Sequence, residues 1–84
     1  MWIDGRESVN RQSVVDYKET MDKIADCMQL CGMKQADLAR EIKSSPVAIN
    51  QWLHGKGFPN LDTLVVIADV FEMYLDDLIV RKQK

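Results

Sequence analysis

The sequence has little of what enzymes, membrane proteins and disulfide-bonded domains require. Its 84 residues include two cysteines, one histidine and two prolines. Cys27 and Cys31 lie four residues apart on one predicted helix, which favours core thiols over a redox or metal role. His54 has no accompanying nucleophile or carboxylate constellation, so we expect no catalytic residue, no metal and no cofactor.

Long apolar runs and secretion signals are also missing. No stretch approaches the roughly 20 apolar residues of a membrane span, and no signal-peptide pattern is present at the N-terminus. We therefore expect a cytoplasmic protein without a membrane partner. The length and the 46% apolar content are typical of one globular domain with a limited core.

The segment over residues 35–55 has the pattern of two short helices joined by a tight turn. In the first helix, Leu38, Ala39 and Ile42 form one apolar stripe. Ala39 is small enough to let two helices cross closely. Lys43 then breaks the helical period, so the first helix is predicted to end there.

Local signals mark both ends of the second helix. Ser45 offers a hydroxyl N-cap, and Pro46 follows at the first helical position, where its missing N–H is tolerated. Because the residue before a proline avoids the α region, the first helix cannot continue into the second. Gly55 is the usual residue just after a helix end, and Ile49 and Trp52 lie on the inner side.

Polar and small side chains occupy the outer side and the start of this second helix. In a helix-turn-helix, the N-terminal part of the second helix enters the major groove of DNA. Asn and Gln can each pair bidentately with adenine there, and small apolar groups can touch a thymine methyl. For Val47, a role in filling the gap between the two helices stays open. The candidate base contacts are Pro46, Val47, Ala48, Asn50 and Gln51.

The wider pattern resembles the Cro/phage-repressor type of helix-turn-helix proteins, often called the XRE family. The resemblance covers about residues 20–80, and it depends on the order and spacing of many individually weak matches. These are Ile24, Gly32, Met33, Gln35, Leu38, Ala39, Ser45, Ile49, Asn50, Gln51, Trp52, Gly55, Lys56, Pro59, Leu61, Thr63, Leu64, Ile67, Ala68, Leu75, Asp76, Asp77 and Leu78.

The resemblance implies an all-α fold, a compact five-helix domain of the lambda-repressor-like kind. We expect a DNA-binding domain over 14–81, an N-terminal arm over 1–13 and a basic tail over 82–84. The expected helices cover 14–31, 35–42, 46–54, 61–71 and 75–81. The expected core is Ile24, Met28, Leu38, Ala39, Ile49, Trp52, Leu53, Leu64 and Ile67.

The resemblance also implies that the helix over 46–54 reads bases while residues around it hold phosphates. A helix N-terminus with free N–H groups is a natural phosphate site, which gives Gln35 a physical basis for this role. His54 is expected either to meet the carbonyls at its helix end or to contact a phosphate. The expected phosphate contacts are Gln35, Lys43, Ser45, Lys56 and Asn60.

The sequence departs from the family pattern at three places. Lys43 stands where a glycine is common, so a positive φ there would strain the backbone while placing a cation near DNA. Met28 and Leu53 replace an arginine and a glutamate that form a buried ion pair in many relatives. Because both charges are absent together, no charge is stranded, and we predict that the two side chains touch. Tyr74 replaces a Ser or Thr cap.

The net charge of −2 is unevenly distributed along the chain. Residues 34–60 carry +2, residues 61–80 carry −5 and residues 81–84 carry +3. The expected DNA face is therefore mildly basic and the far side acidic, which would orient the domain on DNA. Few phosphates would be neutralised by one subunit, so we expect weak, salt-sensitive binding by a monomer.

Weak monomer binding favours a homodimer that contacts two half-sites about one helical turn, roughly 34 Å, apart. The candidate surfaces for a dimer or a protein partner are the last helix with its tail, and the N-terminal arm. In the arm, Asp4-Gly5 is a turn signal, and Trp2 either belongs to a disordered segment or packs on its own domain or a partner.

The start of the first helix leaves two interpretations open. Ser13 with Asp16 resembles a capping pair, so the helix is expected to begin there. One of its faces is either core, which is the commoner case, or a partner seam. That face consists of Tyr17, Met21, Ile24, Met28 and Cys31.

These observations predict a sequence-specific regulator of transcription that binds double-stranded DNA, a bacterial or phage repressor. One alternative is an antitoxin, whose helix-turn-helix also represses its own promoter. Another is a protein-interaction module that kept the fold without DNA binding. An enzyme is not expected.

Overall fold

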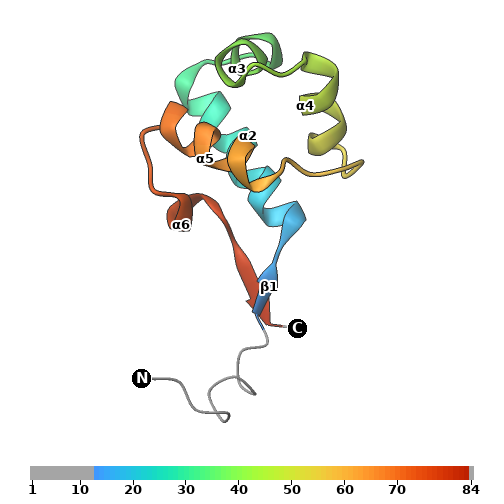
Figure 1. Cartoon of the computed structure of the whole chain (residues 1–84), viewed down its shortest axis with the longest axis vertical. Helices are drawn as coiled ribbons and strands as arrows, with labels where there is room; N and C mark the ends of the chain where they lie inside the picture. Colours follow the sequence, from blue (N-terminus) through green and yellow to red (C-terminus); the bar gives the residue numbers. More distant parts are fainter. Residues whose placement is uncertain (1–12, 84) are drawn as a thin grey trace.

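The structure, a computed structural model, describes residues 13–83, which form five helices and two short strands (Figure 1). The five-helix architecture expected from the sequence is confirmed, whereas the two strands were not expected. No helix in this part of the chain has the length and apolar character needed to cross a membrane. The elements are β1 (Ser13–Val15), α2 (Tyr17–Cys31), α3 (Gln35–Ile42), α4 (Pro46–Leu53), α5 (Leu61–Val70), α6 (Leu75–Leu78) and β2 (Arg81–Gln83).

Three polar side chains cap helix N-termini. Asp16, Ser45 and Asn60 each accept a hydrogen bond from the backbone N–H three residues later, at 3.0, 3.1 and 2.8 Å. These caps begin α2, α4 and α5 and satisfy N–H groups that the helix itself leaves unpaired. Tyr74, which precedes α6, makes no such side-chain bond.

Four helices end in the same backbone reversal. Gly32, Lys43, Gly55 and Glu72 have φ values of 67°, 56°, 77° and 55°. In each case this residue and the next donate their N–H groups back to carbonyls of the last helical turn, which is the Schellman arrangement. The positive φ considered for Lys43 is thus confirmed. Gly32 and Gly55 adopt this conformation without strain, whereas Lys43 and Glu72 do not.

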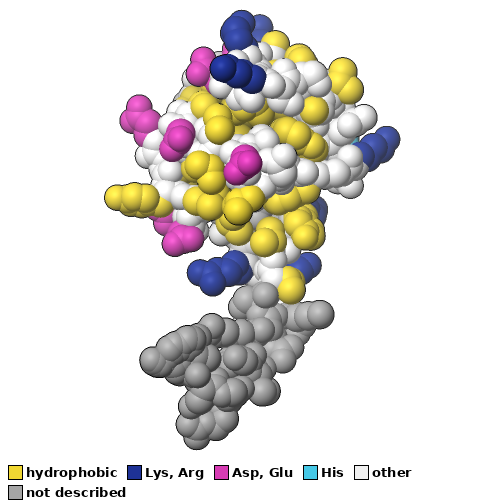
Figure 2. Space-filling model, viewed as in Figure 1, with side chains coloured by type: hydrophobic (Ala, Val, Ile, Leu, Met, Phe, Trp, Pro, Cys, Tyr) yellow, Lys and Arg dark blue, Asp and Glu magenta, His cyan; other side chains and the backbone are white. Residues whose placement is uncertain are grey.

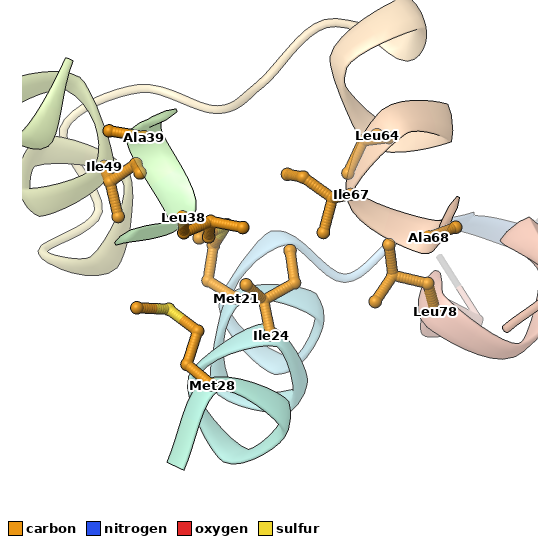
Figure 3. Packing of buried hydrophobic residues seen from close by; sticks show 10 residues of the cluster. All are labelled: Met21, Ile24, Met28, Leu38, Ala39, Ile49, Leu64, Ile67, Ala68 and Leu78. Atoms are coloured by element: carbon orange, nitrogen blue, oxygen red, sulfur yellow. The ribbon is translucent and has the colours of Figure 1, made fainter. Parts of the chain in front are cut away.

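Side chains from all five helices converge in one core (Figure 3). Met21, Ala68 and Leu78 belong to it although they were not among the nine residues of the expected core. Trp52 and Leu53 are half-buried and pack against it, and the direct contact between Met28 and Leu53 stays a prediction. The ten buried apolar residues are Met21, Ile24, Met28, Leu38, Ala39, Ile49, Leu64, Ile67, Ala68 and Leu78.

The apolar face of α2 is divided between core and surface. Its central residues Met21, Ile24 and Met28 are buried in the core, whereas Tyr17 and Cys31 at its two ends are exposed. The core interpretation therefore holds for the centre of this face.

The two ends of the described chain pair as an antiparallel ribbon that projects from the globule opposite α3 (Figure 1). Val14 lies across from Lys82, and Val15 across from Arg81. The helix expected from residue 14 therefore begins only at Tyr17, with Asp16 as its cap instead of Ser13.

The helix expected over 75–81 is also too long, because it ends at Leu78. The β-branched residues Val14 and Val15 favour a strand once a partner strand is available, and residues 81–83 provide one. Lys82 and Gln83, assigned to the tail, lie in β2.

Candidate DNA-binding surface

The packing of α3 against α4 fixes which side of α4 faces outward. Ile49 is fully buried on the inner side, and Trp52 is half-buried beside it. The turn between the helices is set by Lys43 in its left-handed conformation and by Ser45, whose Oγ accepts from the Ala48 N–H at 3.1 Å. The rotation of α4 about its axis is therefore determined by contacts on its inner side and at its start.

The five candidate base contacts lie on the outer side or at the N-terminus of α4. Pro46, Val47, Asn50 and Gln51 are exposed, and Ala48 is half-buried. Val47 is 65% exposed, which favours an outward role over filling the gap between the helices. The side chains with hydrogen-bonding amides and the small apolar groups are thus accessible along one helix face, as base recognition in a major groove requires.

A shallow hollow on this face brings candidate base and phosphate contacts together. It is lined by Val47, Asn50, Gln51, His54 and Lys56. The loop after α4 therefore returns a cation to the edge of the helix that carries the amide side chains. This juxtaposition suits a surface on which bases and an adjacent phosphate are contacted at once.

His54 has a defined role at the end of α4. Its Nδ1 lies 2.8 Å from the backbone carbonyl oxygen of Asn50. A carbonyl oxygen only accepts, so Nδ1 carries the hydrogen, and Nε2 remains for a ligand. The interaction with helix-end carbonyls considered from the sequence is present, and the hollow also leaves room for a phosphate contact.

The candidate phosphate contacts surround α4. Lys43, Ser45, Lys56 and Asn60 are exposed, and Gln35 is half-buried at the first position of α3. Ser45 and Asn60 use their oxygens as helix caps. The Ser45 hydroxyl hydrogen and the Asn60 amide N–H groups can still be donated to a phosphate oxygen.

The N-terminus of α3 carries a hydrogen-bonded cluster of charged residues that the sequence did not predict. Asp37 accepts from the Lys34 backbone N–H at 3.0 Å and from Arg40 Nη2 at 2.7 Å. The Lys34 N–H bond and the Arg40 guanidinium lower the pKa of the Asp37 carboxyl. Lys34 is exposed directly before Gln35. A cation that precedes a helix start is the sequence signal that would have indicated this cluster.

Aromatic packing positions the loop that carries Lys56. The Phe58 ring meets the Tyr17 ring edge-on, with 4.6 Å between centroids, and Pro59 is buried. Gly57 has a φ of 126°, and a Cβ there would lie 3.6 Å from Trp52 Cδ1. Contacts to α2 and α4 therefore fix the path of this loop.

The charged side chains separate over the surface (Figure 2). On the face shown, most Asp and Glu lie around α5 and α6, whereas Lys and Arg lie at the α3 end, where an acidic side chain is also present, beside the loop after α4 and at the ribbon. The ion pairs of the described residues are Lys18–Asp22 and Asp37–Arg40. Within this part of the chain, Lys43 and Lys56 are therefore available to a phosphate.

Comparison with known proteins identifies relatives of the part of the chain that carries this surface. The helix-turn-helix family matches residues 24–78, which include α3 and α4. Over 47 residues the chain is 36% identical to the HTH-type transcriptional activator BcrR of Enterococcus faecalis. This match takes in 56% of the chain but 23% of the activator, so the chain spans about a quarter of that relative's length.

Solved structures resemble about three quarters of the chain. The P22 c2 repressor in complex with a synthetic operator is 25% identical, with a TM-score of 0.65, and the match covers 70% of this chain and 89% of the repressor. The SOS-response transcriptional repressor LexA of Eubacterium rectale is also 25% identical, with a TM-score of 0.69 and coverage of 76% and 69%.

An enzyme is among the similar structures as well. Hydroxypropylphosphonic acid epoxidase of S. wedmorenis is 23% identical, with a TM-score of 0.68. The match covers 76% of this chain and 34% of the epoxidase. At this identity the likeness shows the fold alone.

Proposed function

Because this chain belongs to the XRE-type helix-turn-helix family, we propose that it regulates transcription as a sequence-specific repressor that binds double-stranded DNA. The observation that carries the proposal is the outer face of α4, where Asn50 and Gln51 are exposed beside Lys56. The likeness to an operator-bound repressor over 89% of that repressor's chain supports the same conclusion.

Base reading is assigned to α4 and positioning to the residues around it. The Gln51 and Asn50 amides each present a donor and an acceptor that match the major-groove edge of adenine. Lys43, Ser45, Lys56, Asn60 and Gln35 hold phosphates on either side of the groove and fix the register of the helix. The acidic α5 and α6 side faces away from the DNA.

A homodimer on DNA forms part of the proposal. Residues 34–60 carry a net charge of +2, so one subunit releases few counterions and binds weakly. Two copies related by a two-fold axis would place their α4 helices in half-sites about 34 Å apart and read a palindrome.

The proposal leaves the protein without a catalytic role. The epoxidase likeness involves about a third of that enzyme and shows the fold alone. A regulator of this kind acts in the compartment that holds the DNA, which in a bacterium is the cytoplasm.

Selection from random duplex DNA tests this function. Purified protein is mixed with a randomised duplex pool at near-physiological salt, and the bound fraction is amplified and sequenced. We expect an enriched palindrome with half-sites one helical turn apart. Enrichment of a single half-site would contradict the dimer, and no enrichment by the folded protein would contradict sequence-specific binding altogether.

A further inference from the structure

An apolar groove runs between the start of α2 and the end of α4 with its following loop. It has a volume of about 700 Å³, which is within the usual range of ligand sites. We call it the aromatic groove. The five large apolar side chains in its walls are Tyr17, Met21, Trp52, Leu53 and Phe58.

The aromatic groove is separate from the surface assigned to DNA bases. The hollow over the outer side of α4 is lined by Val47, Asn50 and Gln51, none of which lines the aromatic groove. His54 borders both. Tyr17 is 61% exposed although its ring packs on Phe58, so a large aromatic surface remains open to a further apolar group.

The chain's own N-terminal segment has the chemistry to fill this groove. Residues 1–12 contain Trp2 and Ile3 side by side in an otherwise mostly polar sequence. The segment joins β1 at Ser13, four residues before Tyr17 in the groove wall. The point of attachment is therefore the outer end of the ribbon, about 13 Å of extended chain from the α2 end of the groove.

The length of the segment suits a return to the groove. Trp2 precedes Ser13 by eleven positions, and a flexible chain of that length spans about 18 Å on average and at most about 36 Å. A tether this short gives an effective concentration in about the millimolar range. At micromolar protein concentrations, the segment of the same molecule therefore outcompetes that of a second copy.

We propose that residues 1–12 fold back on their own domain and bury Trp2 and Ile3 in the aromatic groove. Burial of a tryptophan and an isoleucine against Tyr17, Trp52 and Phe58 supplies the hydrophobic driving force. The Asp4-Gly5 pair provides a turn directly after the buried residues. The occupant is thus a segment of this chain, bound in cis.

Docking has a consequence for DNA binding, and this consequence alone depends on the proposed function. One wall of the aromatic groove is formed by Gly55, Gly57 and Phe58, the loop that carries Lys56. A docked segment would add contacts to this loop and hold Lys56 more firmly in place, so loss of the segment should weaken DNA binding at all sequences alike.

Nuclear magnetic resonance of the full chain tests the docking without DNA. The Trp2→Ser/Ile3→Ser double variant should shift the Trp52 indole N–H and the amides of Tyr17 and Gly57, whereas Val9→Ser in the same segment should not. Nuclear Overhauser contacts should join the Trp2 ring to Tyr17 and Phe58. Absence of these contacts and shifts would overturn the proposal.

A groove variant and a dilution series complete the test. Tyr17→Ser changes an exposed wall residue, so the domain should stay folded while the Trp2 indole signal moves to its position in a free peptide. The spectra of the unaltered chain should be the same at 20 µM and 500 µM protein. Groove contacts that appear only at the higher concentration would mean binding by a second copy and would contradict docking in cis.

Discussion

Lys43 and Glu72 hold a left-handed backbone conformation that strains every residue with a Cβ. Their φ values are 56° and 55°, and this conformation costs an L-residue about 1–2 kcal/mol. Lys43→Gly and Glu72→Gly should each raise the free energy of unfolding by about 1 kcal/mol, since the flexibility of glycine in the unfolded chain offsets part of the gain. Urea denaturation of the two variants measures this.

The two glycine variants also separate stability from DNA contact. Lys43 lies in the turn before α4, whereas Glu72 lies on the acidic side of the molecule. Lys43→Gly should weaken binding at all sequences and reduce the salt slope by about one. Glu72→Gly should leave DNA binding unchanged, and equal affinities of the two variants would exclude Lys43 as a phosphate contact.

Gln51 and Lys56 lie in one hollow but have different proposed roles. Gln51→Ala should weaken the preferred site by about 1–3 kcal/mol and relax the preference at one base pair, because it loses a bidentate base contact. Lys56→Ala should weaken every sequence alike and flatten the salt dependence. Fluorescence anisotropy on the selected site and on random duplexes distinguishes these outcomes. If both variants lose the same affinity on both duplexes, the roles are wrong.

At the scale of single elements, the start of α4 depends on Ser45. Its Oγ accepts from the Ala48 N–H at 3.1 Å, so Ser45→Ala should lower the free energy of unfolding by about 1 kcal/mol. Aspartate is an equally good cap, so Ser45→Asp should keep this stability. Because its carboxylate would repel a phosphate, Ser45→Asp should still weaken DNA binding at all sequences.

Thermal unfolding and DNA titration of both Ser45 variants are the measurements. Ser44→Ala serves as the control, since the Ser44 hydroxyl makes no hydrogen bond to the other described residues. If Ser45→Asp binds DNA as tightly as the unaltered chain, no phosphate lies near the α4 N-terminus.

The N-terminus of α3 should make stability depend on pH. The Lys34 N–H bond and Arg40 lower the folded-state pKa of Asp37 below its unfolded value. The stabilisation is therefore fully present above the unfolded pKa of about 3.9 and is lost as the pH falls through the lower folded value. Urea denaturation between pH 5 and pH 2 should show a smaller loss for Asp37→Asn than for the unaltered chain. Identical pH profiles would contradict this role.

At the scale of the whole molecule, locally encoded features could be predicted and long-range pairings could not. The ends of α4 were predicted from Ser45, Pro46 and Gly55, because each acts within one turn of its own position. The exposed face of α4 likewise followed from the inward period of Ile49 and Trp52.

The ribbon and the aromatic groove could not be predicted from the sequence, because both depend on contacts between distant segments of the chain. Strand β1 forms only because residues 81–83 return to pair with it, and a pattern read along 13–16 resembles a helix cap instead. The groove needs Tyr17 beside Phe58, a contact between segments that no local period links. Both features depend on the tertiary fold, which overrides local propensity.

Thr20 ties the two ends of the described chain together. It is fully buried, and its Oγ1 accepts from the Val80 N–H at 3.0 Å, next to the bond from the Asp16 N–H to the Val80 carbonyl at 2.8 Å. Thr20→Val keeps the shape but leaves the Val80 N–H without its partner, which should lower the free energy of unfolding by about 1–3 kcal/mol. Hydrogen exchange at Val80 should accelerate together with this loss.

The Thr20→Ser variant isolates the hydrogen bond from the packing of the methyl group. It loses a buried methyl and therefore some stability, but it keeps the hydroxyl acceptor, so the Val80 amide should stay slow to exchange. Fast exchange at Val80 in both variants would mean that the hydroxyl and the methyl group are both needed to hold the ribbon against α2. Slow exchange in both would mean that pairing between β1 and β2 holds the ends together without Thr20.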